Sequence, residues 1–98
     1  EGLIRDFVAR PVPADWQNWT PEIRRLFWGG GGTDNTAPLV PRDRICAMEV
    51  WVELLGGDAR YLSRADLREI NDVLAAAPGW ISYRGRFPPY GNQRGFMR

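Results

Sequence analysis

The clearest hydrophobic pattern lies in residues 63–79, where apolar side chains recur with the period of a helix. Ser63 suits the N-cap, and Asp66 suits the first turn, near the positive end of the helix dipole. Pro78-Gly79 is typical of a helix end. The residues that share the apolar face are Leu67, Ile70, Leu74 and Ala77. The pattern predicts one helix with a defined N-terminus, apolar face and C-terminus.

Residues 42–55 carry a second, wider apolar pattern, which predicts a helix at the centre of the core. Asp43 is its expected cap. The apolar stripe is Ile45, Met48, Val52 and Leu55, widened by Ala47, Trp51 and Leu54. Glu49 and Glu53 share the remaining face, where exposure to solvent or pairing with arginine is favoured over acid–base catalysis. The short connection at Gly56-Gly57 favours a helix-turn-helix pair.

Residues 80–98 change to a strand-like pattern. Residues 80–87 mix aromatic, β-branched and polar positions, and residues 93–98 return after a turn at 88–92. Helix, turn, helix and hairpin follow one another in the order of a winged-helix domain. We therefore expect a mainly α fold with a small β-hairpin, the wing.

Residues 1–41 carry weaker signals, and we expect them to form one small domain together with residues 42–98. Residues 1–14 are interpreted as a tail, because two prolines interrupt them. A short helix over 20–28 is predicted from its Thr20 cap, and residues 29–41 are expected to be a glycine-rich mobile loop. The expected buried face of the short helix is Ile23, Leu26 and Phe27.

The tryptophans of this half permit two interpretations. Trp16, Trp19 and Trp28 suit packing in a small core. The same side chains suit a surface that binds a partner or stacks on bases. The pattern of residues does not separate these two.

Two absences limit the chemistry, since the 98 residues include no histidine and no lysine. A P-loop ATPase lacks its lysine here, and a serine or cysteine nucleophile lacks its histidine base. Cys46 is the only cysteine, which excludes the usual zinc sites and favours a packing role. We therefore expect neither catalysis nor a cofactor. We also expect a cytoplasmic protein without membrane contact, and a piece of a longer chain because it begins at Glu1.

Charge is unevenly spread, although the formal net charge is only +1. Residues 1–79 hold nine arginines and twelve acids, a balance of −3, whereas residues 80–98 hold four arginines and no acid, a balance of +4. Arginines interleaved with aromatic rings suit a nucleic-acid backbone. The expected DNA-contacting residues are Arg84, Arg86, Tyr90, Arg94 and Arg98 in the wing, supported by Arg64 and Arg68 in the helix. The alternative is a solvated hairpin whose arginines pair with Glu49, Glu53 or Asp72.

Several runs within residues 42–98 also resemble a known family. The runs are 44–51, 53–56, 68–74, 78–80, Tyr90-Gly91 and 93–96. In order and spacing they resemble the C-terminal end of virulence-associated protein E proteins, phage- and prophage-encoded replication proteins with a P-loop, helicase-like ATPase domain. The resemblance implies a DNA-binding accessory domain that follows the ATPase domain. The alternative expectation is a protein-interaction or oligomerisation module that docks on that ATPase domain or on a neighbouring subunit.

Overall fold

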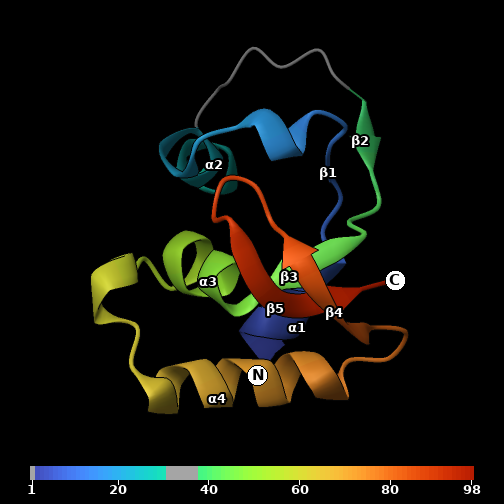
Figure 1. Ribbon diagram of the computed structural model, residues 1–98. Coiled ribbons are helices and arrows are strands. Elements are labelled where there is room, and N and C mark those ends of the chain that lie inside the picture. Colours follow the sequence, from blue (N-terminus) through green and yellow to red (C-terminus); the bar gives the residue numbers. More distant parts are fainter. Residues whose placement is uncertain (1, 31–37) are drawn as a thin grey trace.

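The computed structural model describes residues 2–30 and 38–98. In chain order the elements are α1 (Gly2–Ala9), β1 (Val12–Pro13), η1 (Trp16–Asn18), α2 (Pro21–Trp28), β2 (Leu39–Val40), β3 (Arg44–Cys46), α3 (Ala47–Glu49), η2 (Val50–Leu54), η3 (Ala59–Tyr61), α4 (Arg64–Ala76), β4 (Ile81–Arg86) and β5 (Asn92–Met97). Figure 1 shows α4 along one side of the molecule and α2 on the opposite side, with a sheet between them. The fold is mixed α/β.

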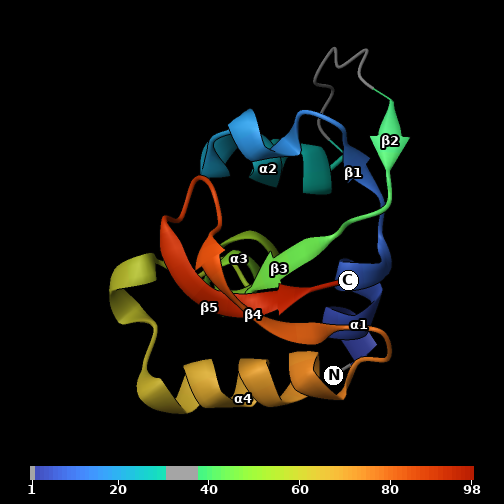
Figure 2. The same ribbon diagram turned by 45° about the vertical axis from the view of Figure 1, so that its right-hand side comes forward.

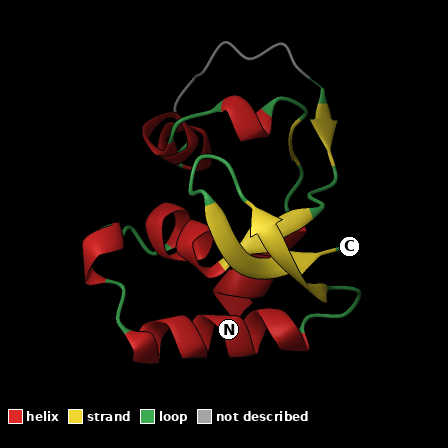
Figure 3. Ribbon diagram, in the orientation of Figure 1, coloured by secondary structure: helices red, strands yellow, loops and turns green. Residues whose placement is uncertain are grey.

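The main sheet is antiparallel, with strand order β3-β5-β4. Ile45 of β3 lies opposite Phe96 of β5, and Phe96 lies opposite Ser82 of β4. The predicted hairpin is confirmed as β4 and β5. The sequence predicted only these two strands, whereas the sheet has a third strand, β3 (Figure 3).

Residues 44–46 were expected to begin a helix and instead form β3. The helical segment starts only at Ala47, so Asp43 does not cap it. It continues as a π-helix over Val50–Leu54, in which the Leu55 N–H donates to the Val50 carbonyl at 3.1 Å. An apolar run this short fits either a strand or a helix, and pairing with β5 is what makes these residues a strand.

Helix α4 confirms the strongest pattern. The Ser63 hydroxyl accepts a hydrogen bond from the Asp66 N–H at 3.1 Å, which is the N-cap contact expected. Ile70 and Leu74 are buried, whereas Leu67 remains 39% exposed at the edge of the apolar face. The helix therefore covers the core with the face that its periodicity predicted.

The N-terminal segment is not a tail. Residues 2–9 form α1, and its Ile4, Phe7 and Val8 side chains are buried in the same cluster as Leu74. Helix α1 packs against both α4 and η2. It completes the core because its three apolar residues share one helical face.

Helix α2 buries a different face from the one that the sequence predicted. The Thr20 cap is confirmed, since the hydroxyl accepts from the Ile23 N–H at 3.3 Å. However, Ile23 and Leu26 are 41% and 58% exposed, and the side chain turned inward is Arg24, at 1% exposure. A buried arginine requires buried acids nearby, and these come from the α3–η2 segment described below.

Residues 10–43 separate α1 from β3, and we call them the insert. Its two arms meet in a short antiparallel ladder, in which Val12 lies opposite Val40. Figures 1 and 2 show the insert at one end of the molecule, beside the loop that joins β4 to β5. Most of the glycine-rich loop, residues 31–37, lies outside the described residues. Within the described residues, no helix has the length and apolar character that crossing a bilayer requires.

Candidate nucleic-acid interface

Arginines of the hairpin gather on one face because side chains directly opposite each other on antiparallel strands share a face. Arg84 of β4 lies opposite Arg94 of β5, and Arg86 lies opposite Asn92. All four residues are exposed. The resulting surface, which we call the arginine face, holds three guanidinium groups and one amide.

The arginine face lies on the part of the hairpin that extends past the third strand. β3 pairs only with residues 95–97, so residues 92–94 have a neighbour on one side alone. The same side of the sheet carries Ile45 and Phe96 in the core. One side of the hairpin is therefore apolar and buried at one end, and cationic and exposed at the other.

The described residues contain no ion pair that involves a hairpin arginine. Glu49 and Glu53, the expected partners, pair instead with arginines of the insert. Two arginines opposite each other repel, and their side chains begin only about 5 Å apart. An anion placed between Arg84 and Arg94 would relieve this repulsion.

Helix α4 carries both of its arginines on one flank and two of its three acids on the other. Asp66 and Glu69 line a cavity of about 170 Å³ between α4, α1 and η2. Arg64 and Arg68 each stand two residues from Asp66, which is about 200° around a helix. They are exposed on the opposite flank. Asp72 lies one turn beyond Arg68, and the ion pairs found among the described residues do not include these two.

Two expected contact residues use their polar groups in contacts with other parts of the protein. Tyr90 donates its hydroxyl to Glu53 Oε2 at 2.7 Å, so it does not stand free on the wing tip. Arg98 donates from Nε to the Arg42 carbonyl at 2.8 Å, and its guanidinium stacks on Trp80 at 4.5 Å. Both contacts use groups that we expected to face DNA, so neither residue belongs to the arginine face.

Arg24 is the centre of a buried charge network beneath the wing tip. Its Nη1 lies 3.0 Å from Glu53 Oε2 and 3.3 Å from Glu49 Oε2. Its Nη2 donates to the carbonyl oxygens of Trp16, at 2.7 Å, and Pro88, at 3.0 Å. The sequence placed the two glutamates on one helix face and left arginine pairing open, but nothing in the local pattern identified the arginine.

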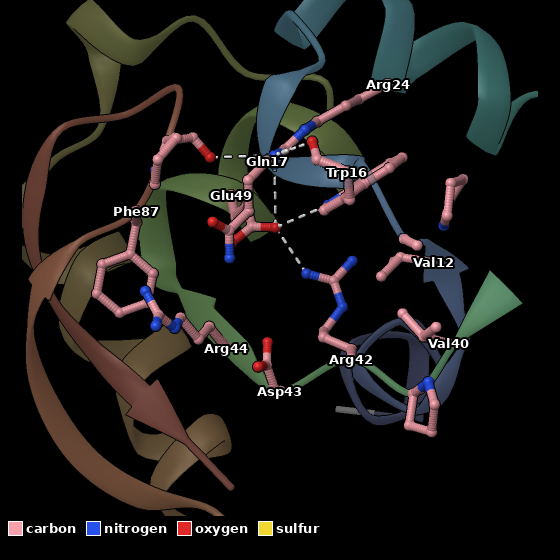
Figure 4. A pocket seen from close by; sticks show the side chains of 14 residues that line it. Val12, Trp16, Gln17, Arg24, Val40, Arg42, Asp43, Arg44, Glu49 and Phe87 are labelled. Atoms are coloured by element: carbon pink, nitrogen blue, oxygen red, sulfur yellow. Dashed lines mark hydrogen bonds and ion pairs between the residues drawn. The ribbon is translucent and has the colours of Figure 1, made fainter. Parts of the chain in front are cut away.

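Arg42 is the second buried cation of this network, and Figure 4 shows it directed toward Glu49. Its Nη1 donates to Glu49 Oε2 at 2.6 Å, whereas its Nε and Nη2 have no hydrogen-bond partner among the described residues. The guanidinium carbon lies 4.9 Å from the Phe7 ring and 5.7 Å from the Trp28 ring. Cation–π attraction compensates in part for the missing hydrogen bonds.

A cavity of about 160 Å³ adjoins Arg42, with Val12 and Val40 among its lining residues (Figure 4). The two unpartnered nitrogens are closed off from solvent, so a bound molecule cannot reach them in this conformation. We therefore assign no ligand to this cavity. Among the described residues, no group of acidic, cysteine or histidine side chains suits a metal ion.

The tryptophans take the packing role. Trp28 donates from its indole to Glu53 Oε1 at 2.9 Å, and its ring lies 5.2 Å from that of Trp16. Trp16 is buried, with Trp19 packed against it at 5.3 Å. The packing interpretation is thus confirmed for Trp16, which is buried, and for Trp28, which packs against the core; Trp19 is half-buried. Trp16 and Trp28 also surround charged groups.

The network shifts the protonation of its members. Burial, and then repulsion from Glu49, raises the pKa of Glu53 above its ordinary value, although Arg24 acts in the opposite direction. Burial, and then the Glu53 charge, raises the pKa of Tyr90, so its hydroxyl keeps its proton and remains a donor. Burial also raises the pKa of the Cys46 thiol, to about 12.

Sequence reasoning missed Asn92, whose place beside the arginine face depends on strand register. It also missed Arg24 and Arg42 as buried residues, since arginines are rarely fully buried. No protein-family model matches the chain, and no curated protein shows a significant match to it.

Proposed function

We propose that this chain is a winged-helix DNA-binding domain that contacts the phosphate backbone through its arginine face. The observation that carries the proposal is the opposed, exposed pair Arg84 and Arg94, which has no acidic partner among the described residues. Guanidinium groups bind phosphate oxygens in a two-pronged geometry. Arg86 adds a third cation on the same face.

The order of the elements supports the winged-helix part of the proposal. Apart from the insert, the chain runs helix, strand, helix, helix, strand, strand: α1, β3, α3–η2, α4, β4 and β5. The last strand lies between the other two in the sheet. In such a domain α4 would also face nucleic acid, and its Arg64 and Arg68 would add cations on the side of the sheet opposite to α2 and the wing tip.

The binding test uses labelled duplex, forked and single-stranded DNA at about 50 and 200 mM salt. We expect affinity to fall steeply with salt. Arg84→Ala combined with Arg94→Ala should weaken binding about tenfold or more and lower the salt slope by roughly two. The matched control is Arg5→Ala with Arg60→Ala, which removes the same charge from exposed residues off the hairpin. Equal losses in both double variants, or no loss in the first, would contradict the proposal.

A second candidate function is a protein-interaction module, and the exposed face of α2 favours it. Ile23 and Leu26 are exposed there, three positions apart on one helix. Exposed apolar side chains that lie together on one helix face suit a contact surface. Sedimentation at increasing concentration tests self-association through this face. Association that Leu26→Ser abolishes, without DNA binding, would favour this function over the first.

The resemblance to virulence-associated protein E proteins remains a prediction. It fits the proposal because an accessory DNA-binding domain needs no catalytic residue of its own. Binding of forked DNA by this chain would agree with a role beside a helicase-like ATPase domain.

A further inference from the structure

The loop at the tip of the hairpin is attached to the interior by two hydrogen bonds. Arg24 Nη2 donates to the Pro88 carbonyl at 3.0 Å, and the Tyr90 hydroxyl donates to Glu53 at 2.7 Å. Figures 1 and 2 both show the loop rising from the sheet toward α2. We call these two contacts the tip anchor.

Both anchoring groups are themselves fixed. The Arg24 side chain is 1% exposed and that of Glu53 is fully buried. Arg24 also bonds the Trp16 carbonyl and Glu49, and Trp28 bonds Glu53. Each group therefore has little freedom to rotate, and the loop is attached to rigid points.

A hairpin needs such attachment where it extends beyond its sheet. The end that carries Arg84 and Arg94 has only two strands, since β3 stops at Cys46. Two-stranded ribbons are weakly stable alone and vary widely in twist. Without the tip anchor, the direction of the arginine face would be poorly defined.

We infer that the insert and η2 together position the wing through the tip anchor, with Arg24 and Tyr90 as positioning residues that fix the direction of the arginine face for DNA. The inference rests on the proposed function for its DNA part, whereas its conformational part stands on the tip anchor alone. It gives the insert a specific task beyond filling the core.

The test removes one hydroxyl, in the variant Tyr90→Phe. The matched control is Tyr61→Phe, because Tyr61 is 70% exposed and lies in η3, away from the hairpin. Amide hydrogen exchange is measured at Phe87 and Tyr90, whose N–H groups close the loop onto Gly91 and Phe87. We expect exchange there to be about tenfold faster in Tyr90→Phe and unchanged in the control.

The second measurement is DNA binding at several salt concentrations. We expect Tyr90→Phe to weaken binding roughly threefold to tenfold and to lower the salt slope by about one, as one phosphate contact is lost. A lower folded fraction alone would leave the slope unchanged, so the slope distinguishes positioning from simple destabilisation.

The outcomes separate the two proposals. Wild-type exchange rates in Tyr90→Phe would overturn the positioning inference, whatever the DNA result. Unchanged affinity and slope in Tyr90→Phe would also overturn it, while the loss in the arginine double variant would still support the proposed function. If the wild-type chain binds no DNA, the proposed function fails, and the exchange data alone decide whether the tip anchor holds the hairpin.

Discussion

Arg24 and Glu53 are 29 residues apart in the sequence, yet their side chains form an ion pair of 3.0 Å in the protein interior. Arg24→Met should lower the free energy of unfolding by about 3–5 kcal/mol, because it leaves Glu49 and Glu53 buried with less compensation. Urea denaturation measures the loss.

The control for this prediction is the exposed pair of Arg60 and Asp58, also 3.0 Å apart. Arg60→Ala should leave the urea midpoint within experimental error, since solvent screens exposed pairs. Adding Glu53→Gln to Arg24→Met should recover part of the lost stability, because the remaining buried charges, Arg42 and Glu49, then balance. A loss below about 1 kcal/mol in Arg24→Met would show that the network is not buried as described.

Glu53 should make stability depend on pH. Its pKa in the folded protein is raised above the ordinary value of 4.5, so the folded state holds this proton more tightly than the unfolded state. Stability should therefore fall as pH rises from about 4.5 through the raised pKa, and should level off above it.

The comparison with Glu53→Gln isolates this effect, because glutamine does not titrate. The wild-type chain should gain stability relative to the variant as pH decreases through that window. Thermal or urea unfolding at several pH values measures the difference. A constant difference, or one that moves the other way, would contradict the raised pKa.

Gly95 lies where three strands meet and has no room for a side chain. An added Cβ would lie 2.5 Å from the Ile45 carbonyl oxygen and 2.5 Å from the Phe87 ring. Gly95→Ala should therefore destabilise the protein by about 1–3 kcal/mol. Gly2→Ala is the control, since nothing lies within 4 Å of a Cβ there. Equal midpoints for the two variants would mean that β3 does not pack against β5 at Gly95.

Cys46 should be unreactive in the folded protein. The thiol has no exposed surface, and burial raises its pKa to about 12, so the reactive thiolate is scarce at neutral pH. An aromatic disulfide reagent should label it only as fast as the chain unfolds, and immediately in urea. Rapid stoichiometric labelling without denaturant would contradict its position in β3.

The sequence predicted those elements whose signals are local. Helix α4 was found because the Ser63 cap and Pro78-Gly79 stop lie within the segment itself. The hairpin was found for the same reason, since its turn residues lie between two strand-like runs. The arginine face followed from charge segregation, which is also visible in the sequence.

The elements and side-chain positions that the sequence did not predict are determined by contacts between residues far apart in the chain. Residues 44–46 become a strand through pairing with residues 95–97, about fifty positions away. Helix α2 turns its arginine inward and its Ile23 outward because Glu49 and Glu53 lie beneath it, which no local pattern indicates. Helix α1 has a visible apolar face, but the partner that buries it comes from the far half of the chain. The bond from the Tyr90 hydroxyl to Glu53 was not predicted, because its acceptor lies in another segment.

The short ladder between Val12 and Val40 brings the two arms of the insert together. A few linking residues would therefore close the gap if the segment between these two strands were deleted. Such a shortened chain would still be unstable, because Glu53 would lose its buried counterion Arg24, whereas Glu49 would keep Arg42. The need to keep buried charges paired applies equally to natural variants and to engineered ones. We expect a shorter homologue to carry an apolar side chain at position 53, so loss of this segment and loss of that acid should be inherited together.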